Sequence, residues 1–515
     1  MTIGTIWLTA ASAAESREPN TAHSKSRFTC ALVVALLIGL PGCGDSTRVE
    51  RSPDESAADD PTADGAEATT PAHPTFRNLV LISIDTLRAD RLGCYGYERQ
   101  TSPNIDRFAA RSLLFSQATS AATNTTPSHM SMFTGLHASV HGQFNLKLGK
   151  DSEALATAAL LPESMPTLAE RLDAEGFRTL AYTDGGYLTA ELAFDRGFDE
   201  FQRQAETVDR KVDRVLKRLA NVNHDERVFL FVHTYEVHSP YVPPVEHDLF
   251  TDKSYDGPWV EKVAKLRANA KRGGFQGGAK FLPPKSETTR ADQRQLSNLY
   301  DGGIHFTDAE IGRLLVALTS GPWADDTAIL LLSDHGEGFL EHDTFSHGGP
   351  YHTITHVPFI LHLPGGPTGR IDAPVSGVDV SPTILELLGL PAATVSDGIS
   401  VMGKLPSDRA ILSYSNDPAK GGGLSLQIGD EKLLRTMSAA PWERYDLGSD
   451  PGEQHPLPMD TPEARNMVRR AENEAETLSE LAEALREGVS IETGELSDET
   501  LESLRALGYI GEDDG

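Results

Sequence analysis

Two apolar segments of this sequence each end on side chains that could bind a metal ion. Residues 78–84 lead directly to Asp85, and residues 328–333 lead to Asp334 and His335. Near-continuous apolar runs of this length are typical of buried parallel strands, and ligands of open α/β sheets bind beyond the carboxyl ends of such strands. We therefore predict that Asp85, Asp334 and His335 share one metal site. For Asp85 or Asp334 alone, capping of the following turn is the alternative.

A hydroxyl group lies between these two segments. Thr125 precedes Pro127 and a helix that the pattern places from Ser128 onward. Threonine is a weak nucleophile unless a metal ion or a base stabilises its ionised oxygen, and it also commonly caps a helix. Because carboxylates, an imidazole and a hydroxyl occur together, the pattern suggests ester hydrolysis. Taken alone, Thr125 would be a capping residue, and its roles as nucleophile and metal ligand depend on the flanking motifs described below.

The surrounding pattern must supply a scaffold for these residues. Predicted strands at 78–84, 178–182, 228–232, 327–332 and 357–363 alternate with predicted helices at 104–111, 128 onward, 165–175, 290–318 and 380–390. Such alternation predicts an α/β domain with a mostly parallel sheet flanked by helices. Short strands at 410–414, 424–428 and 432–436, followed by acidic helices at 461–486 and 497–507, predict a small antiparallel α+β subdomain. The polar stretch 252–287 is predicted to be a surface insertion.

The first part of the chain has the pattern of an export signal. Lys25 and Arg27 precede residues 28–40, an apolar run that suits a signal peptide better than a membrane span. Residues 40–43 resemble a bacterial lipoprotein processing site, which would make Cys43 the lipidated first residue. An ordinary export signal or an uncleaved anchor is the alternative. We therefore expect a periplasmic or cell-surface protein, anchored to the membrane through Cys43.

These patterns divide the chain into four predicted parts. They are a leader (1–43), an acidic Ala/Thr/Pro-rich tether (44–75), a catalytic α/β domain (76–405) and the C-terminal subdomain (406–515).

The formal net charge of −29, from 75 acidic and 46 basic residues, opposes binding to nucleic acids. Only three cysteines occur, two of them in the leader, so the sequence has no disulfide framework. The composition leaves the oligomeric state open.

Several motifs together resemble the sulfatase family of the alkaline phosphatase superfamily. They lie at 83–96, 125–129, 133–135, 194–199, 333–337, 375–390 and 445–453. The family's sulfatases carry Cys or Ser, oxidised to formylglycine, where this chain has Thr125. A secondary alcohol cannot give that aldehyde, and a sulfated threonine has no second geminal hydroxyl with which to expel its sulfate. Relatives of alkaline phosphatase that use threonine form a phosphothreonine, so the resemblance implies a phosphoryl-transfer nucleophile on a sulfatase-like fold.

The resemblance also implies roles for further residues. His129 stands where the family has an arginine, and we expect it to bind substrate. His238 would contact the transferred anion or a second metal, with Glu236 as a possible partner. His347 falls about where sulfatases place a lysine near the anion, so His238 and His347 are expected to stabilise the phosphoryl oxygens. A structural role in a turn is the alternative for both histidines.

The ligand types narrow the choice of metal. An all-oxygen site would suit calcium, whereas His335 shifts the expectation towards zinc or manganese. We expect one or two divalent ions. Asp301 and His305 have the spacing of some two-metal phosphatases, but they lie inside the predicted helix 290–318 and are left out of the site. His141 and Asn145 could line the pocket, or belong to a polar loop.

The combined prediction is a metal-dependent, sulfatase-like hydrolase that cleaves sulfuric or phosphoric esters through a covalent Thr125 intermediate. The threonine favours phosphate diesters, phosphonates or phosphoglycerol- and phosphoethanolamine-type transfer. The substrate would be a small-molecule, glycan or lipid ester. A catalytically idle surface-binding protein with the same fold is the alternative from another class, and bound metal would distinguish the two.

Overall fold

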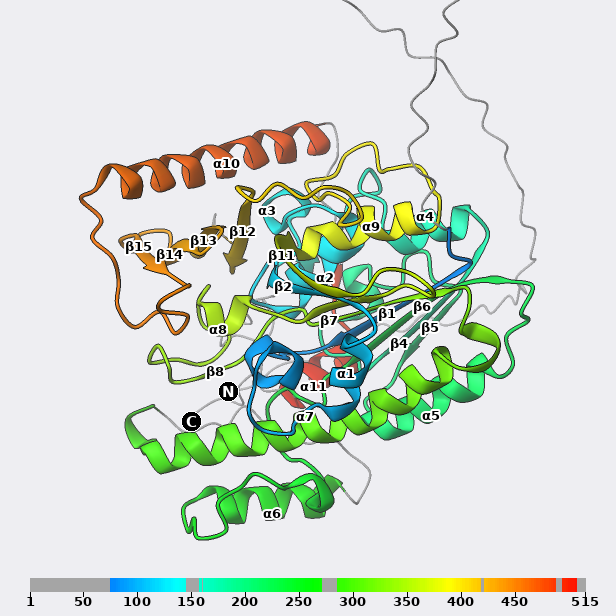
Figure 1. Cartoon of the computed structure of the whole chain (residues 1–515), viewed down its shortest axis with the longest axis horizontal. Helices are drawn as coiled ribbons and strands as arrows, with labels where there is room; N and C mark the ends of the chain where they lie inside the picture. The colour runs from blue at the N-terminus through cyan, green and yellow to red at the C-terminus, as the bar shows by residue number, and fades with distance from the viewer. Residues whose placement is uncertain are drawn as a thin grey trace, which may run out of the picture. The chain divides into compact units, whose positions relative to one another are not determined.

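An eight-stranded sheet forms the centre of the protein (Figure 1). The computed structural model describes residues 75–144, 157–159, 161–270, 285–417, 421–487 and 493–506, all of which belong to one compact unit, Thr70–Gly515. The strand order is β11-β2-β10-β7-β1-β6-β4-β5. In chain order these are β1 (Asn78–Ile84), β2 (Leu113–Thr119), β4 (Phe177–Thr183), β5 (Glu200–Arg203), β6 (Arg227–Thr234), β7 (Thr327–Leu332), β10 (Phe359–His362) and β11 (Gly369–Ser376).

The pairing confirms a mostly parallel sheet. β1 lies between β7 and β6 and runs parallel to both, with Ser83 opposite Leu332 on one side and His233 on the other. β10 is antiparallel to both of its neighbours, β7 and β2. The three central strands therefore end at the same edge of the sheet, immediately before the polar residues singled out above.

Helices cover both faces of the sheet, which explains why its central strands are apolar throughout. Leu79 and Leu81 of β1 join the core beneath one helical layer, whereas Val80 and Ile82 join the core on the opposite face. The helices of the described residues are α1 (Pro103–Ala109), α2 (Thr125–Thr134), α3 (Ala138–His141), α4 (Leu168–Ala174), α5 (Val208–Leu219), α6 (Trp259–Ala270), α7 (Arg290–Leu318), α8 (His352–Thr355), α9 (Val380–Leu387), α10 (Pro462–Arg486) and α11 (Asp498–Ala506). Figure 1 shows α2 and α9 above the sheet, and α5 and α7 below it.

The helix boundaries correct one prediction that matters for the site. α7 has the predicted bounds, but α2 begins at Thr125 rather than at Ser128. Asn124 is extended, with φ −141° and ψ 154°, and Pro127 lies in the first turn of the helix. Proline fits there because the first amides of a helix have no intrahelical acceptor. Thr125 is therefore the first residue of a helix and not part of a preceding turn.

A second, four-stranded antiparallel sheet follows the main domain. It consists of β12 (Ala410–Ser415), β13 (Gly422–Ile428), β14 (Glu431–Met437) and β15 (Glu443–Asp446), in that order. The small antiparallel subdomain is thus confirmed, although its core residues, including Leu412 and Leu426, belong to the same hydrophobic cluster as α2 and α9. Two short pairs complete the strands of the described residues: β3 (Thr157–Ala159) with β16 (Thr493–Glu495), and β8 (Gly338–Phe339) with β9 (Phe345–Ser346).

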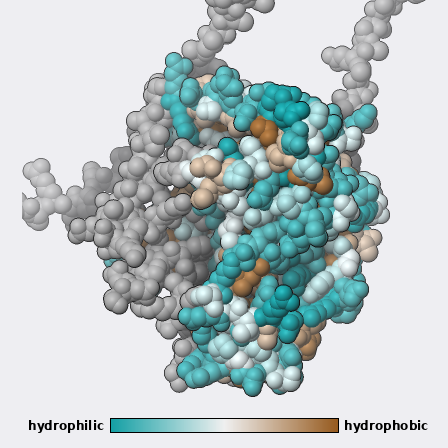
Figure 2. All heavy atoms as spheres, turned by 90° about the vertical axis from the view of Figure 1, so that its left-hand side faces the viewer, coloured by the Kyte–Doolittle hydropathy of each residue, from teal (hydrophilic) through white to brown (hydrophobic). Residues whose placement is uncertain are grey.

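Some predictions concern residues that the structure does not describe. The leader, the tether up to residue 74, Cys43 and Asn145 lie outside the described residues. Of the insertion 252–287, the described part contains α6, whose Trp259 is buried. None of the described helices is long and apolar enough to cross a membrane. The described atoms on the face in Figure 2 are mostly hydrophilic, in keeping with the acidic composition.

The contact between α1 and α7 should make stability depend on pH. Asp308 of α7 accepts hydrogen bonds from the backbone amides of Asn104 and Ile105, at 3.0 and 2.7 Å, and burial raises its pKa to about 6. Between about pH 4 and pH 6 the folded state therefore binds this proton more tightly than the unfolded state does, so stability falls as pH rises through that window. An Asp308→Asn variant does not titrate here. We expect its free energy of unfolding, relative to the wild type, to rise by about 1–3 kcal/mol from pH 4 to pH 7.

Urea unfolding of both proteins at several pH values measures this difference. A constant offset from altered hydrogen bonding of the amide does not affect the trend with pH. A difference that stays constant across the window would contradict the prediction.

Candidate active site and metal centre

Two adjacent strands, β1 and β7, position the first group of polar side chains. Asp85 follows β1, while Asp334 and His335 come two and three residues after β7. Their ligand atoms lie within 4.8 Å of one another, and all three side chains are buried. The sequence prediction had placed these residues together, and the structure brings them together. We call Asp85, Asp334 and His335 the first cluster.

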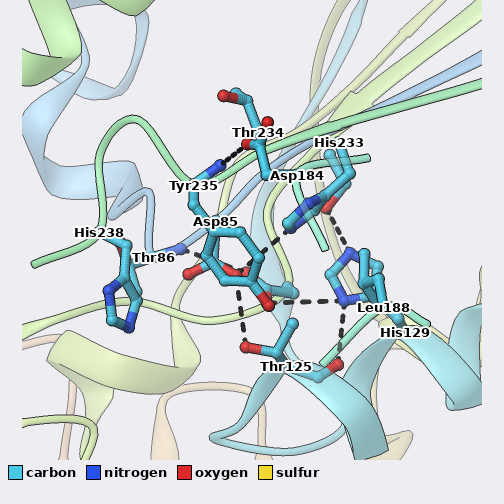
Figure 3. A network of polar contacts seen from close by, with 12 residues as sticks. Asp85, Thr86, Thr125, His129, Asp184, Leu188, His233, Thr234, Tyr235 and His238 are labelled. Atoms are coloured by element: carbon cyan, nitrogen blue, oxygen red, sulfur yellow. Dashed lines mark hydrogen bonds and ion pairs between the residues drawn. The ribbon is translucent and has the colours of Figure 1, made fainter. Parts of the chain in front are cut away.

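α2 brings Thr125 to this cluster. The Thr125 hydroxyl donates a hydrogen bond to Asp85 Oδ2 at 3.3 Å and lies 3.5 Å from His335 Nε2. The Ser128 hydroxyl donates to the Asp334 carbonyl at 2.7 Å, which fixes the first turn of α2 against the end of β7. Figure 3 shows Asp85 between Thr125 and His233. Because Thr125 begins a helix, its oxygen also lies at the positive end of the helix dipole, where an anion is stabilised.

Strain and a backbone contact help to hold Asp334. Thr86 has φ 56°, a left-handed conformation that is costly for a β-branched residue. This turn lets the Thr86 amide donate to Asp334 Oδ1 at 3.2 Å, and the His335 amide donates to the same oxygen at 2.9 Å. Asp334 Oδ2 is thereby left pointing towards the cluster. The backbone has therefore positioned one carboxylate oxygen for a ligand.

The residues of the first cluster fit a divalent cation. Asp85 Oδ1 and Asp334 Oδ2 are buried and accept no hydrogen bond. His335 Nδ1 donates to the Gly336 carbonyl at 3.0 Å, so Nε2 carries the lone pair that faces Asp334 and Thr125. Two carboxylates, an imidazole and a hydroxyl are ligands that zinc and manganese both accept. Of the described residues, no lysine or arginine forms an ion pair with either carboxylate.

The two carboxylates also influence each other electrostatically. Burial and the neighbouring Asp334 raise the pKa of Asp85 well above its ordinary value. Burial acts in the same direction on Asp334, but the His335, His129 and His233 imidazoles outweigh it and lower the pKa of Asp334. Two buried carboxylates this close cannot both ionise easily without a cation. The electrostatics therefore agree with the ligand geometry.

His129 and His233 support the first cluster from one side. His129 Nδ1 donates to the Thr125 carbonyl at 2.9 Å, and its Nε2 accepts from the Ser83 hydroxyl at 2.9 Å. Both ring nitrogens of His129 are thus occupied, so the structure favours a positioning role over the predicted substrate contact. His233 Nε2 lies 3.3 Å from Asp85 Oδ2. His233 was assigned no role from the sequence. The predicted strand ended at residue 232, whereas β6 continues to Thr234.

A second group of side chains lies beside the first. His238, Glu337 and His347 bring their ligand atoms within 4.8 Å of one another, and we call them the second cluster. Both histidines were predicted from the sequence, whereas Glu337, which lies in the motif at 333–337, was assigned no role. Burial lowers the pKa of His238 and of His347 to about 4, so both imidazoles are neutral at pH 7. Neutral imidazoles can bind a metal or donate a hydrogen bond, but they bring no charge to an anion.

Other predicted residues lie elsewhere. Glu236 accepts a hydrogen bond from the Val208 amide at 3.1 Å and caps α5, and it belongs to neither cluster. His141 is buried and contacts the Ser131 hydroxyl at 3.1 Å. Asp301 forms ion pairs with Arg91 and Arg99 inside α7, which confirms that it belongs to a structural network. Glu236 and Asp301 therefore have structural partners, and His141 lies at the end of α3 instead of in a polar loop.

Comparison with known proteins agrees with the fold. The sulfatase family model matches residues 77–390. The uncharacterized sulfatase YidJ of Escherichia coli is 24% identical over 431 residues, covering 74% of this chain and 82% of YidJ. An arylsulfatase of Clostridium perfringens is 23% identical over 73% of this chain and 89% of its own length. The crystal structure of a phosphonate monoester hydrolase of Agrobacterium radiobacter has a similar fold, with a TM-score of 0.62 at 20% identity, covering 79% of this chain and 96% of the hydrolase.

Proposed function

The chain belongs to the sulfatase family of ester hydrolases, and from this premise we propose that it cleaves phosphorus esters through a covalent intermediate on Thr125. The observation that carries the proposal is the position of the Thr125 hydroxyl, which begins α2 and donates to Asp85 in a buried cluster of metal-ligand side chains. A hydroxyl that only capped the helix would not need two carboxylates and an imidazole around it. This position of the hydroxyl supports Thr125 as the nucleophile.

Asp85, Thr125, Asp334 and His335 are the residues that would hold a divalent metal ion, with zinc or manganese favoured over calcium. Such an ion supplies positive charge that stabilises an ionised hydroxyl oxygen and the oxygens of a phosphoryl group. His129 holds the Thr125 carbonyl, and Ser128 ties the helix to β7. These contacts keep the nucleophile in place without a large loss of entropy during the reaction.

The reaction has two steps, formation of a phosphothreonine and its hydrolysis. The Thr125 oxygen attacks phosphorus as its proton passes to Asp85 Oδ2, the acceptor of its hydrogen bond. The bond between phosphorus and the leaving alcohol oxygen breaks, and that oxygen takes up a proton from water. A water molecule then attacks the phosphothreonine and gives up a proton, which neutralises the hydroxide left by the first step. The bond between phosphorus and the Thr125 oxygen breaks, and that oxygen recovers its proton from Asp85. The products are an alcohol and a phosphate or phosphonate with one ester group fewer.

Phosphorus esters are favoured over sulfate esters for a chemical reason. A formylglycine hydrate can expel bound sulfate because it has a second geminal hydroxyl, and a threonine has none. Phosphothreonine, by contrast, can be hydrolysed by attack of water at phosphorus. The substrates we propose are phosphate diesters and phosphonate monoesters of a small-molecule, glycan or lipid alcohol.

A substrate series with one common leaving group tests the proposal. The purified protein, loaded with manganese or zinc, would be assayed with bis(4-nitrophenyl) phosphate, 4-nitrophenyl phenylphosphonate and 4-nitrophenyl sulfate. We expect kcat/KM for a phosphorus ester to exceed that for the sulfate by at least about 100-fold. Sulfate turnover equal to or faster than phosphorus-ester turnover would refute it. Absence of turnover with all three substrates, together with absence of bound metal, would favour a binding protein.

A further inference from the structure

Tyr235 brings a second hydroxyl group to the nucleophile. It is the first residue beyond β6, and only 3% of it is exposed. Its phenolic group lies beside the Thr125 hydroxyl, with the carboxylate of Asp85 close by. Figure 3 shows the Tyr235 ring directed towards Thr125. Tyr235 therefore contacts the oxygen that attacks phosphorus in the proposed reaction.

A turn after β4 fixes the direction of the Tyr235 hydroxyl. Gly185 and Gly186 have positive φ angles, 89° and 61°, which glycine adopts without strain. The next residue, Tyr187, donates its backbone amide to the Tyr235 hydroxyl oxygen at 3.3 Å. Because an amide N–H can only donate, the phenolic oxygen accepts in this bond, and its own proton remains for another acceptor.

A buried ion pair holds the backbone of Tyr235. Asp184, at the start of the same turn, accepts the Tyr235 amide at 2.7 Å and forms an ion pair with Lys211 of α5, whose side chain is fully buried. The rings of His233 and His238 pack edge-to-face against the Tyr235 ring, with centroids 4.7 and 5.7 Å from it. The phenol is therefore held in place before a substrate binds, so little entropy is lost when it acts.

These contacts form a chain of hydrogen bonds that ends at the nucleophile. The Tyr187 amide donates to Tyr235, and the Thr125 hydroxyl donates to Asp85 Oδ2 at 3.3 Å. The phenolic proton and the lone pairs of the Thr125 oxygen lie between these two bonds. A hydroxyl oxygen has two lone pairs, so Thr125 can accept from Tyr235 and still direct the other lone pair at phosphorus.

We propose that Tyr235 is a catalytic residue whose hydroxyl donates a hydrogen bond to the Thr125 oxygen. Negative charge develops on this oxygen as its proton passes to Asp85, and again as its bond to phosphorus breaks in the second step. A donor already fixed beside that charge stabilises it. Tyr235 keeps its own proton, so the proton balance of both steps is unchanged. The inference rests on the proposed function, because it concerns the same reacting oxygen.

Removal of the phenolic oxygen tests the proposal. For Tyr235→Phe we expect kcat for bis(4-nitrophenyl) phosphate to fall about 100-fold, while KM changes by less than about 3-fold. Bound manganese, measured by inductively coupled plasma mass spectrometry, should equal that of the wild type. The matched control is Tyr414→Phe, which also loses a buried hydroxyl, one bonded to Ser139 at 3.0 Å, and should keep kcat within about 3-fold. An unchanged kcat in Tyr235→Phe, or an equal loss in Tyr414→Phe, would overturn the proposal.

A double-mutant cycle shows whether the phenol acts through Thr125. In a Thr125→Ala background the acceptor is absent, so adding Tyr235→Phe should change the residual rate by less than about 3-fold. A further 100-fold loss in that background would mean that the phenol acts elsewhere, against the proposal. Failure of the proposed function looks different, because Thr125→Ala itself would then keep wild-type activity. An inactive Thr125→Ala beside a fully active Tyr235→Phe would remove only the role of Tyr235.

Binding of orthovanadate, which mimics the five-coordinate transition state at phosphorus, gives a readout without turnover. Isothermal titration calorimetry of the manganese-loaded proteins should show about 10-fold weaker binding to Tyr235→Phe than to the wild type, and unchanged binding to Tyr414→Phe. Equal affinity of Tyr235→Phe and the wild type would contradict a hydrogen bond that strengthens in the transition state.

Discussion

Replacement of Thr125 with alanine should lower kcat for phosphorus esters by at least about 10⁴-fold, which corresponds to about 5 kcal/mol of lost transition-state stabilisation. The side chain is fully buried at the start of α2, and its hydroxyl is the atom that contacts both Asp85 and His335. Alanine keeps the helix but removes the only oxygen that this residue can offer as nucleophile. Thr125→Ser restores a hydroxyl at the same position, so we expect it to keep activity within about 10-fold to 100-fold of the wild type.

The neighbouring threonine provides the matched control. Thr126 is also buried in the first turn of α2 but belongs to neither cluster, so Thr126→Ala should retain activity within about 10-fold. Trapping of the intermediate gives independent evidence. Rapid acid quenching and mass spectrometry should find a phosphorylated peptide containing Thr125 in the wild type. Full activity of Thr125→Ala, or an intermediate on another residue, would refute the role of this threonine.

The sequence predicted the centre of the fold because that region obeys simple rules. β1 and β7 are apolar over their whole length, since both of their faces are covered by helices, and such runs identify buried parallel strands. The first cluster followed from the same rule: residues that come after adjacent parallel strands meet at one edge of the sheet. A register that places Ser83 opposite Leu332 then brings Asp85 close to Asp334.

The strands at one side of the sheet were missed because their patterns are weaker. β2 is buried but carries Ser116 and Gln117, and β11 begins with exposed polar residues and contains Pro374. β11 lies at the edge of the sheet, where proline and polar residues are tolerated. Their place in the sheet depends on pairing between residues more than 250 positions apart. Local sequence patterns contain no information about such pairing.

The second cluster shows where prediction of a site from sequence ends. His238 and His347 were found through resemblance to known motifs, but Glu337 was read only as part of a motif. Its partners lie 99 positions before it and 10 positions after it in the chain, as their residue numbers show. The contact exists because the chain turns back through the β8–β9 pair, which returns His347 to Glu337. Two such short strands have no recognisable pattern of their own.

Replacement of Asp334 with asparagine should abolish metal binding at the first cluster and lower activity by at least about 10³-fold. Asparagine has nearly the same shape, and its oxygen can still accept the amides of Thr86 and His335. The change therefore removes the negative charge and the ligand oxygen while it keeps the turn. In the absence of metal, the stability of the variant should stay close to that of the wild type, because relief of the repulsion with Asp85 offsets the lost attraction between Asp334 and the neighbouring imidazoles.

The response of stability to metal distinguishes this effect from ordinary structural damage. Metal at 100 times its dissociation constant should stabilise the wild type by about 2.7 kcal/mol, since it binds the folded protein alone. Asp334→Asn should show little of this stabilisation. Asp301→Asn provides the contrast: Asp301 is also a buried carboxylate, but it pairs with Arg91 and Arg99 in α7. Its loss should destabilise the protein by about 2–4 kcal/mol with or without metal and leave the metal-induced shift intact.

Thermal unfolding of the three proteins with and without added manganese measures both effects. We expect the midpoint of the wild type and of Asp301→Asn to rise with metal, and that of Asp334→Asn to stay nearly constant. A metal-dependent rise in Asp334→Asn equal to that of the wild type would mean that the carboxylate is not a ligand. A drop in the metal-free stability of Asp334→Asn as large as that of Asp301→Asn would mean that its main role is structural. Opposite outcomes for two equally buried aspartates would therefore separate the metal centre from the scaffold around it.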